Sequence, residues 1–409
     1  MTARPLRIAM IGPFGLGPKA TVRERALPLA LAMAAAGHRV TVVMPPWHTP
    51  EEAGRAWDEG GVRLEYVGMG PRVPLARHGA IAGRLAARAM AWQPDVVHVF
   101  KPKAHAGLAG AALWALGRLR PGRPPVVVDE DDWEGPGGWN EMEPYPAVAK
   151  ALFACQERWG LRHADGVTVA SRALETLAWG LGADPGTVLY LPNGAAPAIR
   201  GDGARIRGAL GLGERPVILL VTRFFEFDVA RVAAAFAQVH AQAPEARLLV
   251  VGEALYPAEG AAFYRLIDEA GLREAVVTAG WVPLAELPDY VAAGDLAIYP
   301  YDDTLVNRTK CSVKLAGLLA AGVPVVAEAV GQNTEYVRDG HSGLCTPSGD
   351  AAALAEACLR LIGDAALRAR LGAAAADLMR TTYSWEALAE ELLGLYARVL
   401  AGRRAGAAR

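Results

Sequence analysis

The feature that most constrains this chain is a repeated alternation of short apolar runs with helical patterns. Runs such as Leu6–Ile11, Asp95–Phe100 and Arg247–Gly252 are short and rich in aliphatic residues, which is typical of buried strands. The segments between them space their apolar residues as a helix does. Strands that alternate with helices form parallel sheets covered by helices on both faces. The sequence therefore predicts an α/β protein.

The alternation stops between residues 192 and 213, where Gly, Ala and Pro accumulate, and starts again at Pro216–Thr222. A chain of 409 residues is long enough for two or three domains. We predict one doubly wound domain over residues 1–195 and a second over 205–384, with a cleft between them. Sheets of this kind bind ligands at the carboxyl ends of their strands.

Composition excludes several classes of protein. A formal net charge of −1 gives no reason to expect a nucleic-acid partner. No apolar run has the length of a transmembrane helix, and the N-terminus lacks the pattern of a signal peptide. The four cysteines form no CxxC pair and are interpreted as free thiols in a reducing compartment. The expected location is the cytoplasm.

The most informative stretch is 307–343, which predicts a helix, a strand and a second helix. The first helix is expected from Ser312, a suitable N-cap, to Ala321, with Gly322 as a left-handed stop. A strand follows over Val323–Ala327, and Glu335 lies in the second helix.

Two lysines, Lys310 and Lys314, flank the predicted start of the first helix. A helix N-terminus already carries a partial positive charge, so two cations there are unfavourable unless an anion is present. The chain has 42 Lys+Arg but only six lysines, which makes a pair at one helix start unusual. We therefore predict a phosphate site at these lysines; the alternative is two solvated surface side chains.

Motifs along nearly the whole chain resemble one known family. They occur in the expected order: GPFGLGPK, LALAMAAAGHRVTVV, DVVHVF, LPNG, LLVTRFFEF, RLLVVGE, VTAGWV, LAAGVPVVA and GQNTEYVRDGHSGL. The chain resembles a family-4 glycosyltransferase of the GT-B fold, which has two Rossmann-like domains. The resemblance implies transfer of a sugar from a nucleotide-sugar to an acceptor, with retention and without a metal or other cofactor. It also implies that helix 385–400 returns to the N-terminal domain.

The chain departs from the family pattern where the donor is held. The family's two glutamates, eight positions apart, are replaced by Thr309 and Gly317. Arg223 matches the family's phosphate-binding arginine, but Asp228 stands where a lysine is usual. Lys310 and Lys314 are predicted to replace that lost cation.

Other residues are assigned to the donor by the resemblance alone. Gly15 and Lys19 belong to the glycine-rich loop after the first strand, which would lie beside the donor. Gly331 and Glu335 belong to the turn and helix that would complete the same site.

The predicted site of the N-terminal half is a run of four carboxylates, Asp129 to Asp132, after a buried strand. Asp131 occupies the position of a family histidine and is the predicted catalytic carboxylate. Such a run is self-repulsive, which raises the pKa of at least one member if it is buried. The alternative is a solvated acidic turn. The run also spells DxD, a metal motif of a different glycosyltransferase fold, but no metal is expected here.

The acceptor is expected in the same half. Trp133 and Trp139 offer flat faces for a sugar ring, although Trp also serves as a core residue. His98 ends a predicted strand and is either an acceptor contact or a half-buried histidine with its hydrogen bonds met. A glycan or lipid-linked acceptor, and with it peripheral association with the inner membrane face, is expected. Two alternatives stay open: a nucleotide-sugar epimerase on the same fold, and a sugar- or nucleotide-binding relative without activity.

Overall fold

The computed structural model describes residues 4–17, 21–71, 73–119, 122–197 and 199–407. The chain divides into two compact units. Unit 1 comprises Met1–Gly194, Thr309–Cys311 and Trp385–Arg409, and unit 2 comprises Ala195–Arg308 and Ser312–Ser384. Each unit contains one sheet that is parallel or nearly so, and the predicted α/β class is confirmed.

The sheet of unit 1 has eight strands in the order β3-β4-β2-β1-β5-β6-β7-β8. Its strands are β1 (Arg7–Ile11), β2 (Arg39–Met44), β3 (Ala56–Glu59), β4 (Val62–Tyr66), β5 (Val96–Phe100), β6 (Val126–Glu130), β7 (Gly166–Val169) and β8 (Val188–Tyr190). All neighbours pair in parallel except β3 and β4. The edge strand β3 was not predicted, because its residues, AWDE, are mostly polar and exposed.

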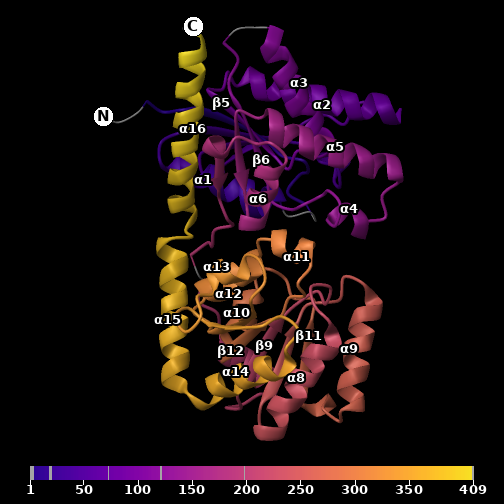
Figure 1. Cartoon of the computed structure of the whole chain (residues 1–409), viewed down its shortest axis with the longest axis vertical. Helices are drawn as coiled ribbons and strands as arrows, with labels where there is room; N and C mark the ends of the chain where they lie inside the picture. The colour runs from indigo at the N-terminus through magenta and orange to yellow at the C-terminus, as the bar shows by residue number, and fades with distance from the viewer. Residues whose placement is uncertain (1–3, 18–20, 72, 120–121, 198, 408–409) are drawn as a thin grey trace. The chain divides into compact units, whose positions relative to one another are not determined.

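Helices cover both faces of this sheet. They are α1 (Leu27–Ala35), α2 (Pro74–Ala91), α3 (Ala104–Leu119), α4 (Trp139–Met142), α5 (Ala147–His163), α6 (Arg172–Gly180) and α16 (Trp385–Ala407). One core joins α1 and α16 to residues such as Ile8 and Met10, while the other joins α2 and α3 to Ala9 and Ile11. Alternate residues of β1 thus enter opposite cores, as the pleat requires. Figure 1 shows α16, in yellow, running beside α1.

The sheet of unit 2 has six strands in the order β11-β10-β9-β12-β13-β14, all paired in parallel. They are β9 (Val217–Val221), β10 (Arg247–Val251), β11 (Val276–Gly280), β12 (Leu296–Tyr299), β13 (Val325–Glu328) and β14 (Leu344–Thr346). The helices of the unit are α7 (Gly203–Ala209), α8 (Val229–Gln242), α9 (Pro257–Glu269), α10 (Leu287–Ala292), α11 (Leu305–Thr309), α12 (Val313–Ala320), α13 (Asn333–Tyr336), α14 (Ala351–Gly363) and α15 (Ala365–Thr381).

The local predictions for the stretch 307–343 are confirmed in their main features. Ser312 caps α12, and its side chain accepts a hydrogen bond from the backbone N–H of Leu315. Gly322 ends the helix at φ 76°, a left-handed angle that suits glycine. The following strand begins two residues later than predicted, after Pro324.

Candidate active site

The end of β9 in unit 2 presents Arg223 to solvent. The next residue, Phe224, is buried and has a left-handed φ of 62°, an unfavourable angle for a residue with a side chain. Its ring packs against Phe263 in the core, with ring centroids 5.2 Å apart. Anchoring Phe224 inward directs the preceding side chain outward. No carboxylate among the described residues pairs with Arg223, so its guanidinium is available to an anion.

Lys314 lies in the first turn of α12, as predicted, but it has a carboxylate partner. Its Nζ is 3.3 Å from Oε1 of Glu226, whose side chain is buried. Glu226 is in the loop that follows Arg223, and it reduces the electrostatic strain on which the phosphate prediction was based. Sequence reasoning missed this pair because 88 residues separate its members.

Gly331 and Glu335 both lie between β13 and β14. Gly331 has φ 51°, and a Cβ there would be 2.6 Å from the backbone oxygen of Arg308, so a side chain is excluded. Glu335 is half-buried in α13, and its backbone oxygen accepts a hydrogen bond from the hydroxyl of Tyr383. The close backbone approach explains the glycine without reference to a ligand.

Lys310 is not where the sequence placed it. It was expected in the same domain as Arg223 and Lys314, but the segment Thr309–Cys311 belongs to unit 1. The hydroxyl of Ser171 donates to the backbone oxygen of Thr309, and the side-chain amide of Asn193 donates to that of Cys311. The Lys310 Nζ lies 5.9 Å from the ring centroid of Trp139, also in unit 1. Such tertiary contacts leave no local signal in the sequence.

The carboxylate run begins in the last two residues of β6, and these two point to opposite faces of the sheet of unit 1. Asp129 is completely buried, and Arg25 donates to both of its oxygens over 2.8 and 2.6 Å. Thr168 donates a further hydrogen bond to the same carboxylate. Because Asp129 is engaged in this way, the first carboxylate of the DxD pattern is not free to bind a metal.

Glu130 points away from Asp129 and is also buried. Neither of its carboxyl oxygens has a hydrogen-bond partner among the described residues. Burial, together with repulsion from Glu157 and Asp131, raises its pKa well above the ordinary value. Burial likewise raises the pKa of Glu157 to about 8, so Glu157 is mostly protonated at neutral pH.

Asp131 has an environment between these extremes. Its side chain is 11% exposed, so it is not part of a solvated acidic turn. Burial raises its pKa to about 6, against the attraction of the Lys101 ammonium, so the group is mostly ionised at pH 7. Its Oδ1 accepts no hydrogen bond from the described residues and lies 3.5 Å from the Lys101 Nζ. Asp131 is therefore a largely ionised carboxylate that is shielded from solvent. Its Oδ1 can accept a hydrogen bond from a new donor.

The two tryptophans differ in environment. Trp133 is 6% exposed and donates from Nε1 to the backbone oxygen of Pro136. A Cβ on Gly135 would come within 2.2 Å of its ring, so the loop wraps this side chain closely. Trp133 therefore serves as a local core, whereas Trp139 is partly exposed beside Lys310.

His98 is fully buried in unit 1. Its ring nitrogens lie 2.8 Å from the hydroxyl of Tyr396 on α16 and 3.2 Å from that of Thr168. Burial lowers its pKa to about 4, so the ring is neutral. The structure thus favours the alternative of a histidine with its hydrogen bonds met over an acceptor contact.

Only part of the predicted glycine loop can be placed. Gly15 is buried against Tyr66, whose ring would be 2.9 Å from an added Cβ. The Tyr66 hydroxyl accepts a hydrogen bond from the backbone N–H of Leu16. Lys19 lies outside the described residues.

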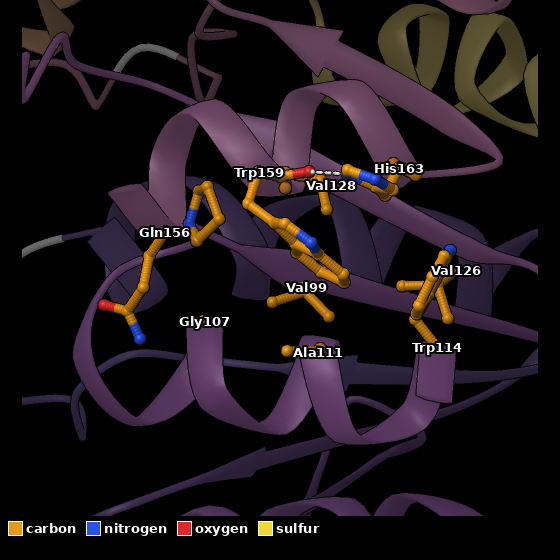
Figure 2. Close-up of a pocket in the computed structure, with 13 residues that line it drawn as sticks. Val99, Gly107, Ala111, Trp114, Val126, Val128, Gln156, Trp159 and His163 are labelled. Carbon is orange, nitrogen blue, oxygen red and sulfur yellow. Dashed lines mark hydrogen bonds between the residues drawn. The ribbon is translucent and has the colours of Figure 1, made fainter. Parts of the chain in front are cut away.

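A small pocket of unit 1 lies between α3, α5 and the sheet, lined mainly by apolar groups such as Val99, Trp114 and Trp159 (Figure 2). Its internal volume of about 10 Å³ holds roughly one water molecule. Gln156 exchanges hydrogen bonds with the backbone of Ala104, and His163 Nδ1 lies 2.8 Å from the backbone oxygen of Trp159. With its polar groups already engaged, the pocket has no features of a sugar or phosphate site.

Comparison with known proteins identifies the chain. Residues 21–194 match the model of a glycosyl transferase 4-like domain, and residues 215–364 match that of glycosyl transferases group 1. The chain is 31% identical over 388 residues to a D-inositol 3-phosphate glycosyltransferase of Stackebrandtia nassauensis, covering 86% of this chain and 79% of that one. It is 25% identical over 407 residues to a phosphatidyl-myo-inositol mannosyltransferase of Mycobacterium leprae, covering 96% and 97%.

Solved structures agree on the fold. HepE of Anabaena, in complex with UDP-glucose, superposes with a TM-score of 0.68 at 18% identity and covers 97% of this chain and 100% of that one. The two α/β units therefore define a GT-B protein. The chain belongs to the family-4 glycosyltransferases, and it is a transferase, as the sequence predicted.

No helix among the described residues combines the length and apolar character needed to cross a bilayer.

Proposed function

We propose that this enzyme transfers a sugar from a nucleoside-diphosphate sugar to a glycan or lipid-linked acceptor, with retention of configuration and without a metal ion. The named relatives support the donor and acceptor classes: HepE binds UDP-glucose, and the Mycobacterium leprae enzyme is named for phosphatidyl-myo-inositol. No cofactor besides the nucleotide-sugar is required by this proposal.

Unit 2 supplies the donor diphosphate site in this proposal. Arg223 lies at the carboxyl end of β9, and Lys314 lies in the first turn of α12. Both stand where ligands of parallel α/β sheets bind, and the N-terminal amides of α12 add positive potential. Charge develops on the diphosphate as the glycosidic bond breaks, so these cations stabilise the leaving group and replace a metal. Lys310 remains a proposed further contact from unit 1.

The chemistry proposed for unit 1 rests on the environment of Asp131. Its carboxylate is mostly ionised at neutral pH, is shielded from bulk solvent, and has an oxygen without a donor among the described residues. Glycosyl transfer passes through a sugar with oxocarbenium character. A carboxylate near that sugar stabilises the developing positive charge or accepts a hydrogen bond from a sugar hydroxyl.

Turnover assays test the proposal directly. The purified enzyme is incubated with a panel of UDP- and GDP-linked hexoses and with inositol phosphate or phosphatidylinositol vesicles, in the presence and absence of EDTA. Release of nucleoside diphosphate that is insensitive to EDTA is expected, with a glycoside product whose anomeric configuration, by NMR, matches the donor. An inverted product, or activity abolished by EDTA and restored by a divalent cation, would contradict the proposed mechanism.

A further inference from the structure

Lys101 occupies a strained position at the carboxyl end of β5. Its φ is 53°, in the left-handed region that lysine rarely adopts. The backbone N–H of Lys101 nevertheless continues the sheet by donating to the backbone oxygen of Asp129 over 2.8 Å. A glycine would meet this geometry without strain, so the conformation gains its value from where it puts the lysine side chain.

The Lys101 ammonium lies among three carboxylates that follow β6. Its Nζ is 2.8 Å from Oδ2 of Asp132, 3.4 Å from Oε1 of Glu134 and 3.5 Å from Oδ1 of Asp131. The lysine side chain is only 9% exposed. A buried cation with several carboxylate partners holds each of them in place, because moving one partner leaves charge uncompensated.

The neighbours of Asp131 leave Lys101 as its main source of positive charge. Asp129, Glu130 and Asp132 are the neighbouring acids that interact with it, and Arg25 is a weaker source of positive charge. Arg25 is already committed to Asp129 through two hydrogen bonds, and Glu130 carries no positive charge in any state. The Lys101 ammonium is therefore the strongest influence that opposes the effect of burial on Asp131.

We propose that Lys101 is a positioning residue that keeps Asp131 ionised and aimed at the transferring sugar. The inference rests on the proposed function, because it gives Lys101 a role only through Asp131. Lys103, two residues further on, pairs with Glu134 over 2.6 Å and forms no ion pair with Asp131 among the described residues, so it provides a matched control.

The test is the pH dependence of kcat for hydrolysis of the nucleotide-sugar that gives the highest turnover in the donor panel, measured for Lys101→Met, Lys101→Arg and Lys103→Met. An opposite charge at this range lowers a carboxyl pKa by about 1–3 units. Lys101→Met should therefore move the acid limb of the kcat profile upward by about one pH unit or more. Lys101→Arg should restore most of the wild-type profile, and Lys103→Met should leave the limb in place.

An acid limb unchanged in folded Lys101→Met overturns the inference, as does an equal shift in Lys103→Met. If Lys101→Met does not fold, the charge-matched pair Lys101→Met/Asp132→Asn replaces it. An upward shift is still expected there, because Lys101 acts on Asp131 more strongly than Asp132 does. No shift in that pair also overturns the inference. A failure of the proposed function itself would give a different result. If Asp131 has no role in the reaction, Asp131→Asn retains wild-type turnover.

Discussion

The Nζ of Lys314 lies 3.3 Å from Oε1 of Glu226, so the cation at the start of α12 is bound to a buried carboxylate of unit 2. The Glu226 side chain is 3% exposed and that of Lys314 is 28% exposed. Glu226 therefore orients Lys314, whose side chain stays partly exposed at the start of α12.

Lys314→Ala should weaken binding of a nucleoside diphosphate about tenfold or more, because a charged hydrogen bond contributes about 1.5–3 kcal/mol. Binding of the bare nucleoside should change little. Isothermal titration calorimetry with UDP, GDP and the matching nucleosides measures both.

The control for Lys314 is the double variant Glu226→Gln/Lys314→Met, which removes the lysine without leaving a buried carboxylate unpaired. If the lysine only neutralises Glu226, this double variant binds nucleoside diphosphate as tightly as the wild type. An equal loss of diphosphate and nucleoside affinity would also contradict the phosphate role.

Arg223→Gln should lower kcat strongly and change the thermal stability of the protein little. Arg223 is exposed and has no carboxylate partner among the described residues, so its removal should leave the unfolding midpoint nearly unchanged. Loss of one cation that stabilises the leaving diphosphate should cost about 2–4 kcal/mol in the barrier, a fall in kcat of roughly 30-fold to 1,000-fold. Steady-state kinetics measure the change in kcat, and thermal unfolding measures the change in the midpoint. A lowered midpoint with unaltered kcat would assign Arg223 to structure.

Asp131→Asn should reduce turnover far more than nucleotide affinity. The wild-type group has a pKa of about 6, raised by burial, so its ionised fraction falls as the pH drops through 6. The kcat profile of the wild type should therefore have an acid limb near pH 6, and the residual activity of Asp131→Asn should lack it. Steady-state rates between pH 5 and 8 provide the check. Retention of the same limb in the variant would assign it to another group.

How far the sequence predicted this protein depends on the range of each interaction. Ser312 and Gly322 were correctly placed because a cap and a left-handed stop act within one turn of helix. The strand order of each sheet follows the parallel α/β pattern, which is repeated along the whole chain. The antiparallel edge strand β3 was missed because its polar residues carry no strand signal.

The site was predicted less completely, because partners far apart in the chain decide it. Asp131 was chosen for its place after a buried strand, but Lys101 and Glu157, which surround the same carboxylate cluster, come from other elements. The retained lysines were a usable signal: Lys101 is one of only six in the chain. Nothing local could show that Lys310 belongs to unit 1, since that follows from contacts to Ser171 and Asn193.

The buried acids predict a pH-dependent stability. The pKa of Glu157 is raised from 4.5 to about 8, mainly by burial, so folding favours its protonated form. Below about pH 4.5 Glu157 is protonated in both the folded and the unfolded chain, so it does not reduce the free energy of unfolding. As the pH rises toward 8, the unfolded chain releases this proton while the folded chain retains it. The free energy of unfolding therefore falls with rising pH over this range.

Glu157→Gln should remove that dependence, because glutamine stays neutral and keeps the oxygen that accepts the hydrogen bond from the backbone N–H of Glu134. One pKa unit corresponds to about 1.4 kcal/mol, so at pH 8 the variant should be more stable than the wild type by about 1 kcal/mol or more. At pH 4, below the ordinary glutamate pKa of 4.5, the two should nearly coincide. Thermal unfolding at both values, with the exposed Glu356→Gln as control, measures the effect. A variant that is less stable than the wild type at pH 8 would show that Glu157 is an ionised partner of Lys101 or Lys103 instead.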